Sequence, residues 1–300
     1  MRIRILFFIF SLIAAAPAAA ALNVLACEPE WGALTRELAG DRAKVYEAST
    51  ALQDVHHIQA RPSLIAAARR ANLVVCTGAE LEVGWLPVLT SESGNARIQP
   101  SAPGYFEASR YVNLIEIPKR LDRREGDVHA MGNPHIQTDP RNIAKVAPAL
   151  AARLAQIDPP NAAWYQQRYE SFAKRWQQAI ARWQSEGAPL KGLKVVVHHE
   201  AFDYMFRWLG IEQVGALEPL PGVDPTISHM SELLQAQETN PAKLVLRASY
   251  NDPRASEWFA GRAGIPAVML PFSVGGDDAS KDLFSWYDDM VAILLKAAGK

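Results

Sequence analysis

The sequence predicts an α/β fold of two lobes, each with a mainly parallel sheet flanked by helices, joined by one long helix. In both halves of the chain, short continuous apolar runs alternate with amphipathic segments, which is typical of parallel strands covered by helices on both faces. A stretch of 26 residues without Gly or Pro, 161–186, separates the two halves. We therefore expect an N-terminal lobe over residues 22–158, a linking helix over 159–188 and a C-terminal lobe over 189–300.

The individual elements follow from the same alternation. Apolar or β-branched runs predict strands at 22–27, 43–47 and 73–76, and again at 193–198, 213–217, 244–246 and 267–270. Amphipathic segments predict helices at 31–39 and 63–71, and later at 201–209, 230–238, 254–263 and 283–298.

The linking helix carries aromatic residues at helical spacing, which core packing explains better than a ligand site. Pro159-Pro160 precede this stretch, and Gly187 and Pro189 follow it, as expected at helix boundaries. At ~1.5 Å per residue the stretch gives a rod of roughly 39 Å. A rigid rod of this kind limits closure of the lobes to small tilts.

The first residues have the features of a secretory signal. Arg2 and Arg4 form a basic start, residues 5–16 are almost all apolar, and residues 18–21 are alanines that suit a signal peptidase. We therefore expect residues 1–21 to be a cleaved signal peptide and the protein to be periplasmic. No later segment has the apolar length that a membrane span requires.

Composition excludes several classes of protein. The 31 Lys and Arg residues balance 32 Asp and Glu residues, so the chain lacks the basic surface of a nucleic-acid binder. Only two cysteines are present, which excludes a disulfide scaffold and a zinc or iron–sulfur site built from cysteines alone. Cys27 and Cys76 each end a predicted strand, and export makes a disulfide between them chemically feasible. Strand-end positions do not establish proximity, so this disulfide is a hypothesis.

The histidines fall in short segments that surround predicted strand ends and loops. His199 follows a strand at its carboxyl end, where open α/β sheets bind ligands. His135 lies in a turn before a helix that opens near 139–140, and His56 ends a polar loop. Imidazoles from three separate segments could converge in the cleft between the lobes, and neutral imidazole nitrogens suit Zn²⁺.

Two of these histidines belong to doublets. In His56-His57 and in His198-His199 the neighbouring side chains point to opposite sides of an extended chain. At most one of each pair should face a metal, and the other could donate a hydrogen bond or support a ligand.

Three segments resemble the ligand motifs of the zinc/manganese solute-binding proteins of ABC importers. His56 stands six residues before a Pro-Ser pair in DVHHIQARPS, His135 stands five residues before a Pro in NPHIQTDP, and His199 begins HEAFDY. The resemblance covers the mature chain in order. It implies two α/β lobes, a rigid helical linker and a metal ion in the cleft, bound by these histidines and delivered to a membrane permease.

The chain departs from that family at two points. Members commonly carry a Trp where Gln137 stands, and their fourth ligand is usually a carboxylate after a late strand. Here Pro271 stands near that position, and the first acid after it is Asp277, which we expect as the fourth ligand unless it caps the final helix. The alternatives for the fourth ligand are Asp278, Glu200, His129 and water.

The expected function is therefore metal capture without catalysis. We expect a monomeric periplasmic protein that binds Zn²⁺, with Mn²⁺ as the other candidate, and passes it to an ABC permease in the inner membrane. A secreted zinc-dependent hydrolase with the same three histidines is the rival, with Glu200 or Asp277 as general base. The chain has no His-Glu-x-x-His helix and no Gly-x-Ser-x-Gly turn, so nothing in the sequence positions such a base.

Overall fold

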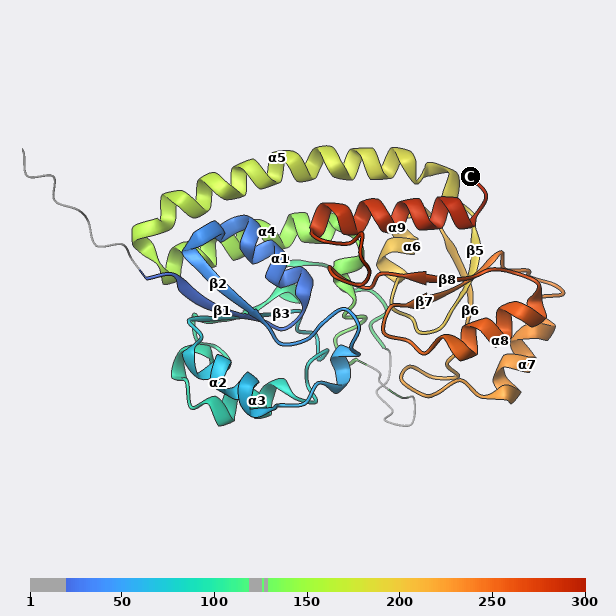
Figure 1. Cartoon of the computed structure of the whole chain (residues 1–300), viewed down its shortest axis with the longest axis horizontal. Helices are drawn as coiled ribbons and strands as arrows, with labels where there is room; N and C mark the ends of the chain where they lie inside the picture. Colours follow the sequence, from blue (N-terminus) through green and yellow to red (C-terminus); the bar gives the residue numbers. More distant parts are fainter. Residues whose placement is uncertain (1–19, 119–125, 127–128) are drawn as a thin grey trace, which may run out of the picture.

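A computed structural model describes residues 20–118, 126 and 129–300, and it contains two sheets side by side under one long helix (Figure 1). Residues 1–19 of the expected signal peptide lie outside the described part. The first sheet has the order β2-β1-β3-β4 and the second β6-β5-β7-β8. All strand pairs in the described part of the chain are parallel. The expected fold class is confirmed.

The strands and helices lie close to their expected positions. The strands are β1 (Leu22–Ala26), β2 (Ala43–Glu47), β3 (Leu73–Cys76), β4 (Tyr105–Glu107), β5 (Lys194–Val197), β6 (Glu212–Ala216), β7 (Leu244–Ala248) and β8 (Ala267–Leu270). The helices are α1 (Pro29–Ala39), α2 (Pro62–Arg70), α3 (Leu86–Ser93), α4 (Pro140–Ile157), α5 (Ala162–Glu186), α6 (Asp203–Leu209), α7 (Ile227–Ala236), α8 (Pro253–Ala263) and α9 (Leu283–Ala297).

Two elements were not expected. The strand β4 is three residues long and follows Gly104, where an added Cβ would lie 2.4 Å from the carbonyl oxygen of Arg97. The glycine therefore lets this edge strand approach a neighbouring loop closely. The helix α3 reads as LPVLTSES, in which the apolar spacing is too short and irregular to predict a helix.

The long helix α5 is part of the core of both lobes. Trp176 at its centre is fully buried, and its indole N–H donates to the carbonyl of Pro140 at 2.8 Å. Its ring lies edge-on to Phe284 and Tyr287 of α9. One continuous cluster of buried side chains extends from Leu22 of the first sheet to the C-terminal helix.

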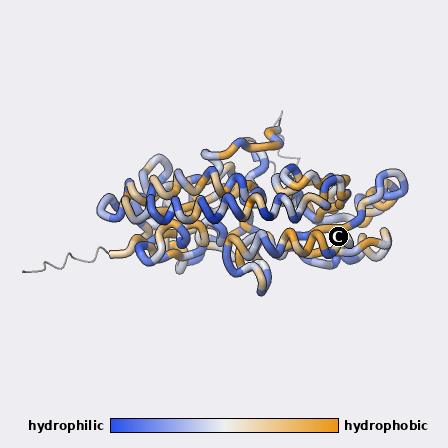
Figure 2. Tube along the Cα trace, turned by 90° about the horizontal axis from the view of Figure 1, so that it is seen from above, coloured by the Kyte–Doolittle hydropathy of each residue, from blue (hydrophilic) through white to orange (hydrophobic). Residues whose placement is uncertain are grey.

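The C-terminal helix closes this core. Seen from above, α9 is mostly hydrophobic along its length up to the C label (Figure 2). It contacts both α5 and α1, so the last helix of the chain packs against the first. The largest core cluster is thus shared between the lobes, and each lobe also has a smaller cluster of its own.

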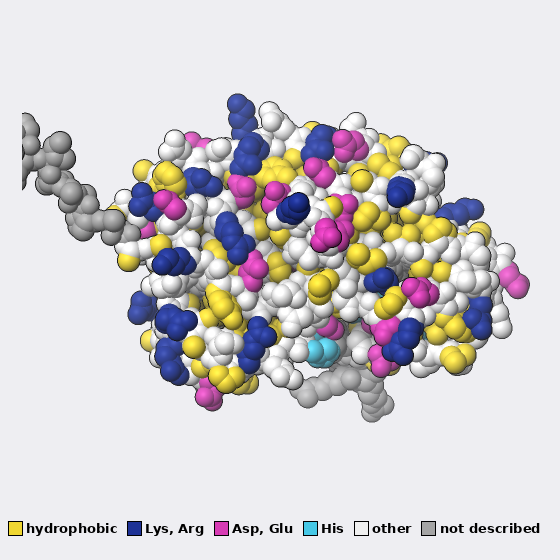
Figure 3. Space-filling view, in the orientation of Figure 1, with side chains coloured by type: hydrophobic (Ala, Val, Ile, Leu, Met, Phe, Trp, Pro, Cys, Tyr) yellow, Lys and Arg dark blue, Asp and Glu magenta, His cyan; other side chains and the backbone are white. Residues whose placement is uncertain are grey.

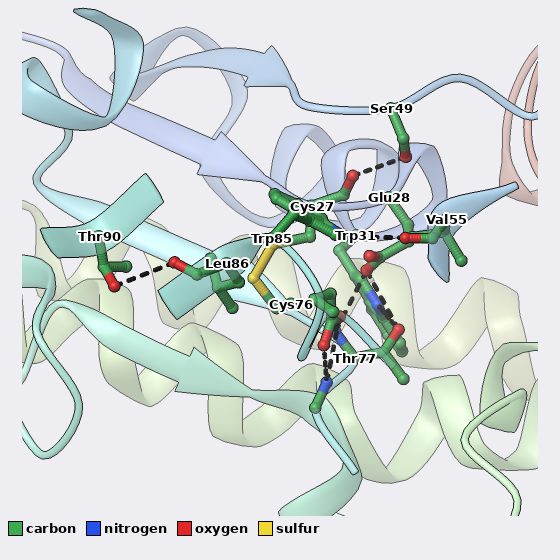
Figure 4. Close-up of a disulfide and its surroundings, with 12 residues drawn as sticks. Cys27, Glu28, Trp31, Ser49, Val55, Cys76, Thr77, Trp85, Leu86 and Thr90 are labelled. Atoms are coloured by element: carbon green, nitrogen blue, oxygen red, sulfur yellow. Dashed lines mark hydrogen bonds between the residues drawn. A yellow bond between two sulfur atoms is a disulfide. The ribbon is translucent and has the colours of Figure 1, made fainter. Parts of the chain in front are cut away.

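The two cysteines form a disulfide, which the sequence alone supports only as a hypothesis (Figure 4). The register of β1 and β3 pairs Ala26 with Val75, so Cys27 and Cys76 stand next to each other at the carboxyl ends of adjacent strands. Their Cα atoms are 4.8 Å apart.

In the described part of the chain, no helix has both the length and the apolar character to cross a membrane.

Candidate metal-binding site

Three histidines from separate segments meet between the lobes. One ring nitrogen from each of His56, His135 and His199 can be chosen so that all three atoms lie within 4.8 Å of one another. The three ring centroids are 5.4–5.8 Å apart in pairs. The space-filling view shows a histidine in the hollow between the lobes, next to acidic side chains (Figure 3). The structure therefore brings together the three histidines that the sequence singled out.

His56 is held by the turn that contains it. It lies in a 3₁₀ turn, Val55–His57, and Asp54 caps this turn by accepting from the backbone N–H of His56 at 3.0 Å. The indole of Trp85 donates to the carbonyl of Val55 at 2.8 Å and anchors the turn to the N-terminal lobe. Asp54 also lies 2.7 Å from Nδ1 of His56, so Nδ1 carries the proton and Nε2 keeps its lone pair.

The carboxylate of Asp54 is suited to this role. Burial acts to raise its pKa, but the hydrogen bonds and charge of His56 outweigh burial and bring the pKa to about 2. Asp54 is therefore ionised at neutral pH and fixes the tautomer of the ring.

His199 follows β5 at its carboxyl end, and a carboxylate from the segment just after β6 orients it. Nδ1 of His199 lies 2.7 Å from Oε2 of Glu218, which also accepts from the N–H of Gly222. Burial lowers the pKa of His199, but the hydrogen bond and charge of Glu218 outweigh it, and the net pKa is raised. The Nε2 atom is left to face His135.

His135 stands before the short turn Ile136–Thr138 and is almost fully buried. Burial lowers its pKa well below the usual value, and the charges of the neighbouring histidines lower it further. The ring is therefore neutral, which is the form that binds a metal. The ring of Phe272 from the C-terminal lobe lies edge-on to the His135 ring, with 5.5 Å between the ring centroids.

A fourth imidazole, that of His129, lies beside this group and contacts His56. Nε2 of His129 lies 3.3 Å from Nε2 of His56, and Nε2 of His135 lies 3.3 Å from Nε2 of His199. In a tetrahedral Zn²⁺ site with Zn–N bonds of about 2.0–2.1 Å, neighbouring nitrogens are about 3.3–3.4 Å apart. Both pairs therefore have the spacing of two tetrahedral ligands.

Asp277, the expected fourth ligand, does not belong to this group. Its carboxylate accepts from the N–H groups of Ala279 and Ser280 at 3.0 and 2.9 Å. The carboxylate of Asp277 is thus hydrogen-bonded within its own loop, which follows β8. Phe272, at the start of the same loop, lies against His135.

The other residues that the sequence offers as ligands or supporting partners also have contacts outside the histidine group or are exposed to solvent. The Glu200 carboxylate accepts from the amide of Gln213 at 2.9 Å, and Asp278 is exposed. His57 is largely exposed, with its Nε2 4.0 Å from Asp54. His198 is buried, with its Nε2 4.0 Å from Glu218. One member of each doublet joins the histidine group and the other does not, as expected, although His56-His57 lie in a 3₁₀ turn and not in an extended chain.

A cavity of about 180 Å³ adjoins three of the four histidines. Glu116 and Glu200 also line it, and Asp203 lies close to both. Burial, together with the charges of these two glutamates, raises the pKa of Asp203 to about 7. A cavity with acidic walls attracts cations from solution.

The chain is similar to known metal-uptake proteins over most of its length. The model of the family described as "Zinc-uptake complex component A periplasmic" matches residues 24–297. The high-affinity zinc uptake system protein ZnuA of Bacillus subtilis is 19% identical over 262 residues, covering 86% of this chain and 80% of that protein. The manganese ABC transporter substrate-binding lipoprotein PsaA of Streptococcus anginosus is 21% identical over 280 residues, covering 92% and 88%.

Solved structures share the fold. A structure described as "Crystal structure of ZnuA" superposes with a TM-score of 0.75 at 20% identity, covering 93% of this chain and 98% of that one. The laminin-binding adhesin Lmb of Streptococcus agalactiae, in a mutant structure, gives a TM-score of 0.74 at 20% identity, covering 92% and 99%. The relatives include both zinc and manganese proteins.

Proposed function

Because the chain belongs to the family of zinc-uptake component A, whose members are substrate-binding proteins of metal ABC importers and not enzymes, we propose that its cargo is Zn²⁺. The ion binds in the cleft between the lobes, and the protein delivers it to a membrane permease. The expected signal peptide supports a periplasmic location.

The proposed ligands are His56, His129, His135 and His199. The observation that carries this set is the pair of Nε2–Nε2 distances of 3.3 Å, which suit two edges of a tetrahedron around zinc. His129 takes the place that Asp277 was expected to fill.

The chemistry of the ligands favours zinc over manganese. Imidazole nitrogens suit Zn²⁺, whereas Mn²⁺ prefers carboxylate and water oxygens. Two carboxylates beside the rings, those of Asp54 and Glu218, hydrogen-bond to Nδ1 atoms and so orient the imidazoles. A site made of four nitrogens also fills the coordination sphere and leaves no open position for a reactive water, unlike a hydrolase site.

A competitive titration against a chromophoric zinc chelator tests the proposal. Replacing His56, His135 or His199 by Ala should weaken zinc binding by more than about 100-fold, because loss of supporting partners alone costs about 10–100-fold. His129→Ala should also weaken binding, and a parallel titration with Mn²⁺ should show weaker binding to the wild type.

Two variants serve as matched controls. His57→Ala removes an imidazole adjacent to a ligand, and Asp277→Ala removes a carboxylate outside the histidine group. Both should bind zinc as the wild type does. A loss in Asp277→Ala with no loss in His129→Ala would contradict the proposed fourth ligand, and unchanged binding in His135→Ala would contradict the site.

A further inference from the structure

A second set of metal-ligand atoms lies at the carboxyl ends of β1 and β3. The sulfurs of Cys27 and Cys76 and one carboxylate oxygen of Glu82 lie within 4.8 Å of one another, and all three residues are buried. None of these residues lines the cavity beside the cleft histidines. In the protein as described, the two sulfurs are joined in the disulfide.

Backbone N–H groups hold the carboxylate of Glu82 in place. It accepts from the N–H of Thr77 at 2.7 Å and from the N–H of Gly78 at 3.1 Å. Thr77 itself is fixed by the indole of Trp31, which donates to its hydroxyl at 2.8 Å. The carboxylate is therefore positioned beside the sulfurs by groups that do not depend on the disulfide.

The carboxylate of Glu28 lies beside this cluster, and only one of its two oxygens accepts a hydrogen bond from a described residue. Oε2 of Glu28 accepts from the N–H and the hydroxyl of Thr77, close to the disulfide (Figure 4). Its other oxygen, Oε1, is buried and has no hydrogen-bond partner in the described part of the chain. A buried carboxylate oxygen without a partner is a free ligand atom that a bound cation would satisfy.

We propose that reduction of the Cys27–Cys76 disulfide creates a buried site for a thiophilic divalent cation such as Zn²⁺, with the two thiolates and Glu82 as ligands and Glu28 as the fourth. Two thiolates with carboxylates form a soft, anionic ligand set that zinc accepts in tetrahedral geometry. The proposal rests on this cluster and not on the cleft histidines.

A phosphine can serve as the reductant of the Cys27–Cys76 disulfide. The phosphorus supplies two electrons and takes up an oxygen atom from water, the S–S bond breaks, and the two protons of that water go to the sulfurs. On binding the cation, the two thiols release these protons to solvent.

The inference gives the disulfide a role in metal handling. A thiolate site in the interior of one lobe would not open when the two lobes move apart, so an ion bound there would be withheld from release. The oxidised sulfurs cannot bind as thiolates, and oxidation therefore leaves the cleft as the place where the ion binds.

A cobalt titration tests this with the mature full-length chain carrying His135→Ala, which removes a ligand of the cleft. Co²⁺ is added without oxygen to the phosphine-reduced and to the oxidised protein. Reduction should produce a sulfur-to-cobalt charge-transfer band that saturates at one ion per chain, and the oxidised protein should show none. Replacing both cysteines by Ser should abolish the band, and Glu82→Gln should weaken cobalt binding by at least about 10-fold.

Each outcome decides the question. A reduced protein with two free thiols, a native near-ultraviolet circular dichroism spectrum and no such band would overturn the proposal. If reduction alone abolishes the native spectrum, cobalt should restore it together with the band, because a structural metal site couples binding to folding. Failure to restore it, or a band of equal strength in urea-denatured protein, would also overturn the proposal. Since the readout is a sulfur band in a protein without an intact cleft site, failure here leaves the proposed cleft site unaffected.

Discussion

Glu218 and His199 are joined by a contact of 2.7 Å between Oε2 and Nδ1, and this contact directs the other ring nitrogen toward His135. Glu218 comes from the end of β6 and His199 from the end of β5, so the contact joins two neighbouring strand ends. The orientation of the ring is thus set by the sheet and does not require the metal.

The first prediction follows from this contact. Glu218→Ala should weaken zinc binding by about 10–100-fold, because the ring loses the acceptor that fixes its tautomer. Glu218→Gln retains an acceptor but no charge and should show a smaller loss. Competitive titration measures both effects, and Glu200→Ala, which removes a neighbouring acid bound to Gln213, is the control. Equal losses in Glu200→Ala and Glu218→Ala would show that charge near the cleft matters and orientation of the ring does not.

The second prediction concerns Glu30, a buried acid of α1 that accepts a hydrogen bond from the hydroxyl of Ser273 in the other lobe. Burial raises the pKa of Glu30 from 4.5 to about 7. The folded state therefore holds a proton that the unfolded chain releases, and stability should fall as the pH rises from about 4.5 to about 7.

The variant Glu30→Gln tests this. Over the same pH range, the free energy of unfolding of this variant should fall by on the order of 3 kcal/mol less than that of the wild type. The reason is that a shift of one pKa unit corresponds to about 1.36 kcal/mol. Urea denaturation at several pH values measures the difference. Glu92→Gln, at an exposed position of α3, should retain the wild-type slope, and a variant Glu30→Gln with that same slope would contradict the assignment.

The third prediction concerns the shared core. Trp176→Ala should lower the free energy of unfolding by about 3–5 kcal/mol, because it leaves a cavity and removes the hydrogen bond to Pro140. Since the ring contacts α9 and lies in a core common to both lobes, unfolding should remain a single transition. Circular dichroism and tryptophan fluorescence should give the same midpoint in urea.

The control is Trp258→Ala in α8, where the indole is half-buried and covered by the guanidinium of Arg262. This variant should lose less than about 2 kcal/mol, because a half-buried ring removes less apolar area from water. Two separate transitions in Trp176→Ala would show that the lobes unfold independently.

The strands could be placed from the sequence because buried parallel strands read as unbroken apolar runs, as in Leu73–Cys76. The strand β4 could not, because three residues carry too little pattern and its position depends on the close approach at Gly104. Alternation along the chain predicts only that one member of each doublet faces a metal, and the choice of His56 and His199 came from the resemblance to the family motifs.

The parts of the site that were not predicted depend on contacts between distant segments. Asp54 and Glu218 orient the rings, yet nothing in the sequence indicates this role: Asp54 opens the segment DVHHIQARPS without being one of its expected ligands, and Glu218 lies outside all three motifs. Two acids that flank Pro29 would ordinarily start an exposed helix, and only the contacts of Glu28 with Thr77 and of Glu30 with Ser273 explain their burial. His129 was one of several alternatives for the fourth ligand, and only its spacing from His56 distinguishes it.

The packing of α9 against α1 and α5 determines when the protein can acquire its native state. A ribosome completes the N-terminal lobe long before it reaches residue 283, but until then the aromatic side chains of α5 lack the rings of Phe284 and Tyr287. A nascent chain therefore remains incompletely folded until the ribosome has added α9, however early its first sheet has formed.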